Sequence, residues 1–384
     1  MSISVFRFPV QVIFGEGCLS EVGTLGKSFG KHALLVTGSG PTSLLPAVDA
    51  VKDMLAAAGI SLTHFSEVKS DPDVEAVEKG TGLALESGCD FVIGLGGGSP
   101  MDAAKVIAVK LTNRGKVASW EGIGRIPNRG KPLICIPTTA GTGSEATSVA
   151  VITGGKRRQK MSLVSQNLYP ILAITDPELT YGMPPRLTAA TGMDALTHAV
   201  ESFVAKKAWE PTQVLSFKAA QLGFGFLERA CSDGSDAEAR RQLSLAALIA
   251  GMGFTTSGLG ISHALSYGLG SHFGMPHGEA NAILLPHVMR FNMEACPESY
   301  RELAGAMGVD VSGLTAGKAA EVASGAVAEL LSALPLPATL GDAGIPESAV
   351  ETLASEAFLL TRFRSSNPRE TVLEDLVQIL RNAY

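Results

Sequence analysis

The sequence predicts an α/β domain followed by an all-α domain, and three observations support this fold class. Residues 1–180 alternate strand-like apolar runs with helical patterns, which is typical of a parallel sheet covered by helices on both faces. Beyond this region, strand-like runs almost vanish and long Ala- and Leu-rich helical segments take their place. A chain of 384 residues also exceeds one typical hydrophobic core. We therefore expect two domains, residues 1–180 and residues 181–384.

The elements of the first domain follow from short apolar runs that end in turn residues. The run HALLVT at 32–37 leads into Gly-Ser-Gly-Pro, and the run DFVIGL at 90–95 leads into Gly-Gly-Gly-Ser-Pro. Apolar residues at helical spacing lie between such runs. The expected strands are 32–37, 61–68, 90–95, 132–136 and 171–176, and the expected helices are 43–59, 73–87 and a segment from the glycines to about residue 112.

The second domain begins after the stretch LTYGMPP at 179–185. Apolar residues at helical spacing then cover most of the remaining chain, without an internal repeat. The expected helices are 186–206, 210–231, 236–254, 260–271, 278–293, 317–333, 347–360 and 370–382.

Charge and composition exclude several classes of protein. Lys and Arg total 31 against 37 Asp and Glu, so the net charge is −6, and no long basic run is present. Such a chain is a poor candidate for nucleic-acid or anionic-membrane binding. The five cysteines form no CxxC pair, the N-terminus lacks a signal-peptide pattern, and no apolar run reaches the roughly 18 residues of a membrane span. We expect a cytoplasmic protein that binds neither nucleic acid nor membrane.

A glycine-rich loop between a predicted strand and a predicted helix offers a site for an anion. Residues 94–105 read GLGGGSPMDAAK. Consecutive glycines let backbone N–H groups converge on an oxyanion, and the helix N-terminus adds unpaired donors. Ser99 is the expected N-cap and Pro100 the expected first helical residue. We expect a phosphate or pyrophosphate here. The alternative is a tight turn without a ligand, which would need fewer than three glycines.

A second loop, rich in small hydroxyl residues, follows another predicted strand end, where α/β folds bind ligands. Residues 137–147 read PTTAGTGSEAT. From this position Thr138, Thr139 and Thr142 could reach ribose or phosphate oxygens. The alternative is a polar loop without a ligand.

Polar residues of the second domain have the spacing of a metal site. Asp194 and His198 lie four residues apart and share one helix face. A carboxylate and an imidazole on one face form half of a divalent-metal site, and His263 and His277 could complete it. The alternative for any single histidine is an ordinary core or surface role. That four of the seven histidines fall within 263–287 favours the metal site.

Five motifs together resemble those of the iron-containing (group III) alcohol dehydrogenases. Their order and spacing match that family over nearly the whole chain. They are GGGSPMDAAK at 96–105, PTTAGTGSE at 137–145, TGMDALTHAVE at 191–201, the block from HAL to PHVM at 263–289, and Asn367-Pro-Arg369. The resemblance implies an N-terminal Rossmann-like domain and a C-terminal helical domain, in the architecture shared with dehydroquinate synthase.

The resemblance also implies roles for individual residues. The implied reaction is reversible hydride transfer between NAD or NADP and an alcohol or aldehyde, with iron(II) or zinc acting as a Lewis acid on the substrate oxygen. The implied metal ligands are Asp194, His198, His263 and His277. The implied dinucleotide contacts are Gly38, Ser39, Gly97, Gly98, Ser99, Asp102, Thr138, Thr139, Thr142 and Lys160. Phe254 matches an aromatic residue of the substrate pocket.

Two positions near the implied site depart from the family pattern. Tyr267 stands where many members have a histidine, and a phenol is a weaker base than an imidazole for proton relay at neutral pH. Gly38 and Ser39 stand where NAD-preferring members place an Asp that binds the ribose 2′-hydroxyl. We therefore expect NADPH to be tolerated as well as NADH.

A third departure concerns the substrate. Phe363 replaces a residue that is often Cys in relatives, and Arg362 and Arg364 flank it. Arginine binds planar or tetrahedral anions through forked hydrogen bonds. We hypothesise a small aldehyde that bears a carboxylate, phosphonate or sulfonate, with Phe363 and Arg364 in the pocket. The alternative is that both arginines point to solvent.

Two other functions stay open at this point. A lyase resembling dehydroquinate synthase would share the architecture and use NAD only transiently, and a non-catalytic protein could bind a nucleotide or metal without turnover. The filled ligand positions and the motif at 191–201 favour the dehydrogenase. As partners we expect a small-molecule alcohol or aldehyde and, for assembly, a homodimer or higher homo-oligomer.

Overall fold

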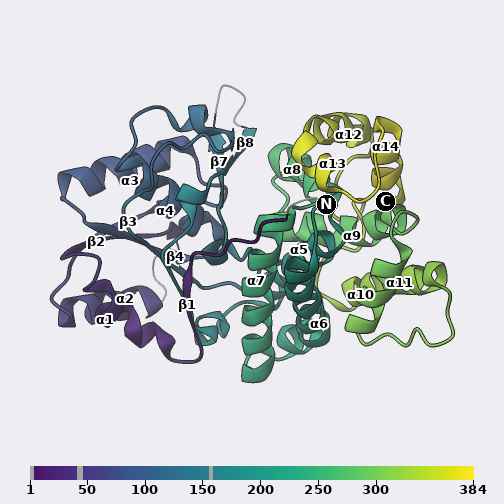
Figure 1. Ribbon diagram of the computed structural model, residues 1–384, viewed down its shortest axis with the longest axis horizontal. Helices are drawn as coiled ribbons and strands as arrows, with labels where there is room; N and C mark the ends of the chain where they lie inside the picture. Colours follow the sequence, from purple (N-terminus) through teal and green to yellow (C-terminus); the bar gives the residue numbers. More distant parts are fainter. Residues whose placement is uncertain (1–3, 41–45, 155–158) are drawn as a thin grey trace. The chain divides into compact units, whose positions relative to one another are not determined.

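The computed structural model describes residues 4–40, 46–154 and 159–384. The chain divides into two compact units, Phe8–Tyr181 and Gly182–Tyr384, and the described residues before Phe8 belong with the second unit. The first unit contains strands and helices, and the second contains helices (Figure 1). The predicted fold class, α/β plus all-α, is confirmed.

A six-stranded sheet, in which every pair of neighbouring strands is parallel, forms the centre of the first unit. Its strands are β1 (Gln11–Phe14), β2 (His32–Gly38), β3 (Ser61–Val68), β4 (Phe91–Gly96), β6 (Leu133–Pro137) and β9 (Leu172–Thr175). Their order across the sheet is β1-β9-β6-β4-β2-β3. Strands β4 and β6 are buried along their whole length, and their carboxyl ends lead directly into the two predicted ligand loops. The sheet therefore places both loops at one edge.

Helices pack on both faces of this sheet, because successive side chains of a strand point to opposite faces. Leu34 of β2 packs in one cluster with Val77 and Ile107. Its neighbour Leu35 packs in the other cluster with Leu55. The helices of this unit are α1 (Val22–Gly26), α2 (Pro46–Ala57), α3 (Val74–Glu86) and α4 (Gly98–Lys110).

A smaller sheet and several 3-10 helices were not predicted from the sequence. Strand β8 (Gln159–Val164) pairs antiparallel with β7 (Val149–Gly154) and parallel with β5 (Gly122–Ile123). Strand β5 has only two residues, and β8 mixes polar with apolar residues, so both lack the signal of a buried strand. The apolar run VAVI of β7 does carry that signal, but it was not among the expected strands. The 3-10 helices are Cys18–Glu21, Val117–Trp120, Ser144–Ala146, Gln166–Leu168, Pro177–Thr180 and Glu347–Ala349.

The second unit is built around α5, whose residues from Thr188 to Val204 are buried except Thr191. Its helices are α5 (Pro185–Val204), α6 (Glu210–Ser232), α7 (Ala237–Ser257), α8 (Ile261–Phe273), α9 (His277–Asn292), α10 (Pro297–Ala306), α11 (Ala316–Ala333), α12 (Val350–Leu359), α13 (Thr361–Ser366) and α14 (Leu373–Asn382). The short α10 and α13 had no counterpart among the expected helices, because they are too brief to show a clear apolar period.

Among the described residues, no single helix has the length and apolar character needed to cross a membrane. Helices α7 and α8 meet that criterion only when taken together, and the chain bends by 107° between them.

Candidate active site

Three of the predicted metal ligands converge in the helical unit. Asp194 of α5, His263 in the first turn of α8 and His277 at the start of α9 each place one ligand atom within 4.8 Å of the other two. Asp194 Oδ1 lies 3.9 Å from His263 Nε2 and 3.7 Å from His277 Nε2. The side chains of Asp194 and His263 are buried, whereas that of His277 is 31% exposed. The cluster is therefore closed on two sides and reachable from the side of His277.

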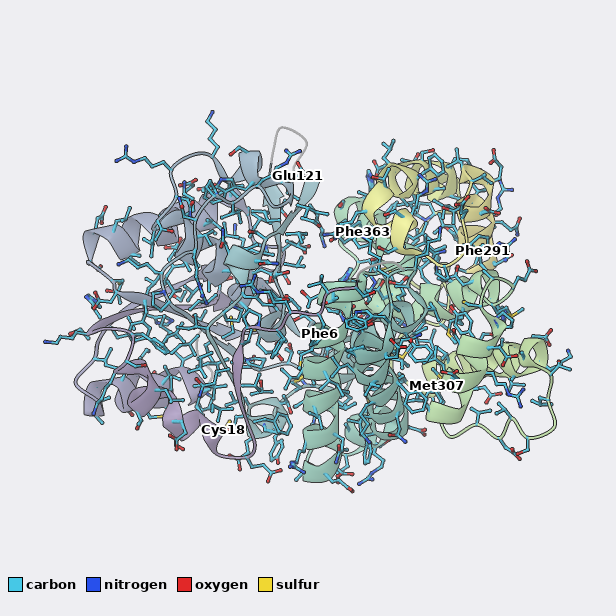
Figure 2. The ribbon with its side chains drawn as sticks, in the orientation of Figure 1. Phe6, Cys18, Glu121, Phe291, Met307 and Phe363 are labelled. Carbon is cyan, nitrogen blue, oxygen red and sulfur yellow. The ribbon has the colours of Figure 1, made fainter. Side chains whose placement is uncertain are left out.

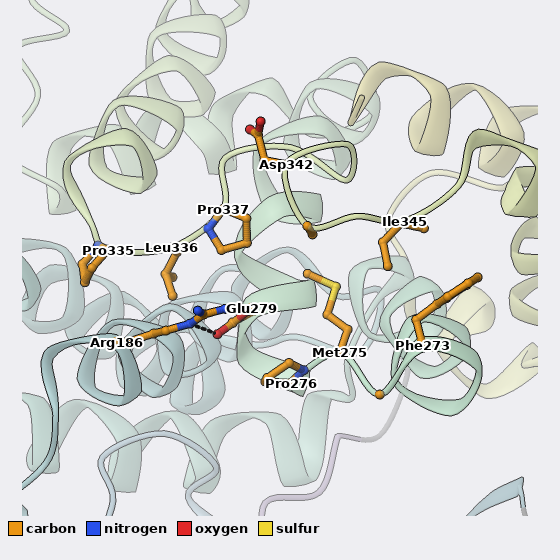
Figure 3. A pocket seen from close by; sticks show the side chains of 12 residues that line it. Arg186, Phe273, Met275, Pro276, Glu279, Pro335, Leu336, Pro337, Asp342 and Ile345 are labelled. Carbon is orange, nitrogen blue, oxygen red and sulfur yellow. Dashed lines mark hydrogen bonds and ion pairs between the residues drawn. The ribbon is translucent and has the colours of Figure 1, made fainter.

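The cluster needs α5 and α9 to lie very close together, and Gly278 permits this. A Cβ atom at Gly278 would overlap the carbonyl oxygen of Ala190 on α5. The ion pair of Arg186 with Glu279 joins the same two helices through two bonds, Nε to Oε1 at 2.7 Å and Nη2 to Oε2 at 2.9 Å. Figure 3 shows this pair at the wall of a pocket that Met275 also lines.

His198 lies beside this cluster without joining it. Its ring stacks on that of His263, with centroids 4.7 Å apart, and on that of Phe254, at 4.5 Å. Its Nδ1 is buried and has no hydrogen-bond partner among the described residues. Burial acts to raise the pKa of Asp194, but the neighbouring histidines, His198 foremost, hold it below its ordinary value. The structure thus brings together three of the four predicted ligands and leaves a buried polar atom on the fourth.

The side-chain amide of Asn281 occupies the point on which the three ligand atoms converge. Its Nδ2 lies 2.8 Å from Asp194 Oδ1, 3.3 Å from His263 Nε2 and 3.2 Å from His277 Nε2. Three acceptors thus face one positively polarised group. Burial, followed by the charges of the neighbouring histidines, holds the pKa of His263 well below its usual range, so this ring is neutral at neutral pH. A carboxylate with neutral imidazoles is a donor set that suits a first-row divalent cation, so these residues fit the implied metal.

Aromatic rings surround the histidines of the cluster. Phe363, from α13 (labelled in Figure 2), is buried and stacks on His263 with centroids 6.3 Å apart. It meets the ring of Tyr267 edge-on at 5.4 Å. Tyr267 in turn lies 6.1 Å from the ring of His277. The predicted pocket residues Phe254 and Phe363, and the predicted proton-relay residue Tyr267, therefore lie beside the histidines.

The two arginines beside Phe363 differ in their surroundings. Arg364 donates to Thr371 Oγ1 at 3.0 Å, to the carbonyl of Thr371 at 3.0 Å and to the carbonyl of Phe358 at 2.8 Å, and it stacks on the Phe358 ring. Its guanidinium is a structural link. Arg362 instead stacks on the Phe363 ring at 4.5 Å, and its charge is one of the smaller influences that lower the pKa of His263.

In the first unit, the two predicted ligand loops lie against each other. Gly97 is the N-cap of α4, without a side-chain cap bond, so the expected N-cap Ser99 lies inside the helix instead. A Cβ on Gly97 would lie 3.4 Å from the Thr139 side chain, and one on Gly98 would lie 2.8 Å from Thr142 Cγ2. The glycines thus let both threonines approach the N-terminus of α4, where unpaired N–H groups suit a pyrophosphate.

A backbone hydrogen bond also joins the two loops, because the N–H of Thr138 donates to the carbonyl of Gly96 at 2.9 Å. Gly96 has a φ of 143°, which favours glycine at this turn. Gly38 ends the neighbouring strand β2 and Ser39 follows it, and the N–H of Ser39 donates to the carbonyl of Val68 at 2.7 Å.

Two charged residues predicted to contact the cofactor are engaged within the protein. Asp102 accepts from Ser144 Oγ at 2.7 Å and from the N–H of Val151 at 2.8 Å, so both of its carboxylate oxygens have a partner. Lys160 Nζ lies 2.7 Å from a carboxylate oxygen of Asp71. The sequence could not show these pairings, because the partners come from other loops and strands.

Three buried residues that the sequence analysis did not single out hold these sites together. The fully buried Lys105 donates to Thr147 Oγ1 at 2.9 Å and to the carbonyl of Val149 at 2.7 Å, which fixes the threonine loop against α4. Asn281 and Glu201 belong to the metal cluster and its surroundings. Asn281 lies four residues after His277, so helical spacing alone could have placed it on the ligand face.

Comparison with known proteins identifies the family of the chain. Residues 9–177 match the family described as iron-containing alcohol dehydrogenase, and residues 188–384 match the C-terminal part of the Fe-containing alcohol dehydrogenase family. The chain is 36% identical to the NAD-dependent methanol dehydrogenase of Bacillus methanolicus, over 98% of this chain and 99% of the relative.

Two solved structures match the whole chain. A crystal structure of 1,3-propanediol oxidoreductase is 36% identical, with a TM-score of 0.97 and full coverage of both chains. The sulfoacetaldehyde reductase of Bifidobacterium kashiwanohense, solved in complex with NAD+, is 30% identical, with a TM-score of 0.89 and coverage of 100% of this chain and 99% of that one.

Fold and site together define an oxidoreductase with a Rossmann-like domain and a helical domain. The chain belongs to the iron-containing alcohol dehydrogenase family, and it is an alcohol dehydrogenase. The predicted family and enzyme class are confirmed, and the lyase alternative is not favoured.

Proposed function

We propose that this chain interconverts an alcohol and an aldehyde with NAD or NADP, at a metal held by Asp194, His263 and His277. The observation that carries the proposal is the convergence of their three acceptor atoms on one amide nitrogen. Iron(II) is the metal that the family implies, and zinc is the alternative. His198 is included as a fourth ligand because its buried Nδ1 has no partner among the described residues.

The mechanism divides between the bound groups and the side chains. A cation bound there would supply Lewis-acid polarisation of a substrate oxygen, and a nicotinamide would carry the hydride. Asp194 would contribute a carboxylate oxygen to a bound cation, and the histidines would contribute imidazole nitrogens. Phe363 and Phe254 cover the histidine rings and exclude water from them. Tyr267, beside His277, is the group proposed to hold the transferred proton at its hydroxyl.

For the cofactor, we propose that the pyrophosphate lies at the N-terminus of α4, against Gly97 and Gly98. Thr139 and Thr142 support this placement because their side chains approach the same helix end. The relatives named for NAD support NAD as a cofactor. Tolerance of NADPH rests on Ser39 and its neighbours, which offer no carboxylate in the part of this strand end that the structure describes.

The loop positions also change the role proposed for Asp102. With both carboxylate oxygens bonded inside the protein, Asp102 is a positioning residue that holds the Ser144 turn against α4. We propose that it acts on the cofactor only through that loop.

For the substrate, we propose a small aldehyde that carries an anionic group. Arg362 supports this, because its guanidinium stacks on Phe363, which in turn stacks on His263. The similar structure named for sulfoacetaldehyde, a short aldehyde with a sulfonate, lends the same support. Arg364 is not proposed to bind the substrate anion, because its guanidinium donates hydrogen bonds to Thr371 and Phe358.

Location and assembly stay predictions. We propose a cytoplasmic protein because all five cysteines are free thiols, and we keep the expected homodimer or higher homo-oligomer.

His263→Ala tests the proposed function. Bound divalent metal should fall to near zero, and turnover should fall by about a thousandfold or more, because a Lewis acid supplies several kcal/mol of transition-state stabilisation. Metal content after iron(II) or zinc loading and turnover with NADH and NADPH are the measurements. Binding of NADH, followed by its fluorescence, should persist. Stoichiometric metal with normal turnover would overturn the assignment.

A further inference from the structure

Glu201 is a buried carboxylate that contacts His263 from the side opposite the ligand cluster. It lies on α5, and its side chain is 2% exposed. Its Oε2 lies 2.6 Å from His263 Nδ1 and accepts from the N–H of Gly260 at 2.9 Å. Its Oε1 accepts from the N–H of Ser262 at 2.7 Å. Every one of these contacts brings a donor, or a ring nitrogen able to donate, to a carboxylate oxygen.

The hydrogen-bond directions around the cluster fix the tautomer of His263. Asp194 is acceptor-only when ionised, so the group of Asn281 that lies 2.8 Å from it is the NH2 group. The same NH2 group faces Nε2 of His263 and cannot accept a hydrogen bond, so Nε2 is assigned as the nitrogen without a proton. The ring proton therefore lies on Nδ1, which donates a hydrogen bond to Glu201 Oε2. The Nε2 lone pair is left pointing at the centre of the cluster.

Glu201 also sets the position of the backbone that carries His263. Helix α8 begins at an N-cap, Gly260, that has no side chain to bond the first N–H groups, and Glu201 takes over that task from α5. A Cβ on Gly260 would lie 2.9 Å from Glu201 Oε1 and 2.9 Å from Asn367 Oδ1. The glycine thus makes room for the carboxylate.

His277 has a different partner on its outer nitrogen. Ser266 Oγ lies 3.3 Å from His277 Nδ1, and a hydroxyl can donate or accept. It therefore suits either tautomer of His277. An ionised carboxylate suits only the tautomer with a proton on Nδ1.

We propose that Glu201 is a positioning residue that fixes the Nδ1–H tautomer and the orientation of His263, and thereby sets the metal affinity of the cluster. The inference rests on the proposed function, because it assumes that His263 is a metal ligand. Glu201 itself contacts neither metal nor substrate. Removal of an outer partner of a metal-binding histidine typically costs 10- to 100-fold in metal affinity.

Glu201→Gln is the test, since it keeps the shape of the side chain and removes its charge. A glutamine has one acceptor oxygen for the three groups that Glu201 faces, so its NH2 group must face either Ser262 or the pair of Gly260 and His263. We expect the affinity of metal-free protein for Zn²⁺, measured by competition with a chromophoric chelator, to fall about 10- to 100-fold. Ser266→Ala is the matched comparison, because it removes the outer partner of His277. The zinc affinity should fall less than in Glu201→Gln, because a long hydrogen bond from a neutral hydroxyl orients its ring less firmly than a carboxylate does.

A spectroscopic measurement separates this role from a merely structural one. In metal-free wild-type protein labelled with ¹⁵N-histidine, ¹H–¹⁵N correlations of the His263 ring, assigned by comparison with His263→Ala, should show the Nδ1–H tautomer. An Nε2–H ring in the wild type would overturn the proposal even if Glu201→Gln failed to fold. Unchanged zinc affinity in a folded Glu201→Gln would also overturn it. If the wild-type protein bound no zinc, the result would instead contradict the proposed function, which places a metal at this cluster.

Discussion

The two units of this enzyme build their candidate ligand sites in opposite ways. In the helical unit, side chains from three helices each point one acceptor atom at the same spot. In the α/β unit, the charged side chains near the loops are bonded within the protein, and the proposed ligand surface is backbone N–H groups made accessible by glycines. The first site should therefore fail when a side chain is removed, whereas the second should fail when atoms are added.

The largest expected effect comes from Gly278, a glycine of the helical unit. It limits the comparison, because here an added Cβ atom should disturb the metal site although no ligand side chain is removed. In Gly278→Ala, the new Cβ overlaps the carbonyl oxygen of Ala190, which is backbone and cannot turn away. Helices α5 and α9 must separate, and these carry Asp194 and His277. We expect the free energy of unfolding to fall by about 3 kcal/mol, at the upper end for overpacking, and zinc affinity to fall with it.

Urea unfolding and zinc titration measure these two effects. Gly225→Ala is the control, because Gly225 lies on α6 with no atom within 4 Å of an added Cβ. It should be neutral or stabilising by up to about 1 kcal/mol. Wild-type stability and metal binding in Gly278→Ala would mean that the two helices are not held as close as the structure places them.

Two adjacent glycines in the α/β unit offer a graded test of the second half of the comparison. In Gly98→Ala the Cβ lies 2.8 Å from Thr142 Cγ2, so the threonine must shift, whereas in Gly97→Ala it lies 3.4 Å from Thr139, an ordinary contact. We expect the Kd for NADH to rise about 5- to 150-fold in Gly98→Ala, from an overpacking cost of roughly 1–3 kcal/mol, and by less in Gly97→Ala.

Fluorescence titration with NADH measures both variants, and their zinc content should stay at the wild-type level. Equal Kd values for the two variants would show that the Thr142 contact does not shape the cofactor loop. Loss of zinc in either variant would contradict the assignment of metal binding to the helical unit alone.

The difference between the two units also explains which features of the fold and the candidate sites could be predicted from the sequence. The fold class followed from apolar periods, and Asp194, His263 and His277 followed from residue types whose chemistry does not depend on distant partners. The roles predicted for Asp102 at the cofactor and for Arg364 at the substrate were less secure. A charged side chain is available to a ligand only if the fold does not bond it to other protein groups. Their partners, such as Val151 and Thr371, are backbone and hydroxyl groups that no sequence motif marks.

The N-cap of α4 shows a related limit. Ser99 is a favoured capping residue, but the helix begins earlier, at Gly98, because the glycine turn already has helical geometry there. Local propensity predicted a boundary two residues late, while the existence of the helix was predicted correctly.

The smallest effect concerns the substrate, and it compares two arginines in one short helix. Arg362 stacks on Phe363, beside the histidine cluster, and is only half-buried, so its contact with an anionic aldehyde should be worth about 1.5 kcal/mol. Arg362→Ala should therefore lose about tenfold in kcat/KM with succinic semialdehyde and change little with butyraldehyde.

Arg364→Ala removes three hydrogen bonds that join α13 to Thr371 and Phe358, so it should lower stability and affect both substrates alike. Steady-state kinetics with both aldehydes, alongside thermal unfolding of each variant, separates the two roles. Equal losses for both aldehydes in Arg362→Ala would remove the anionic-substrate proposal and leave an alcohol dehydrogenase without selectivity for charge.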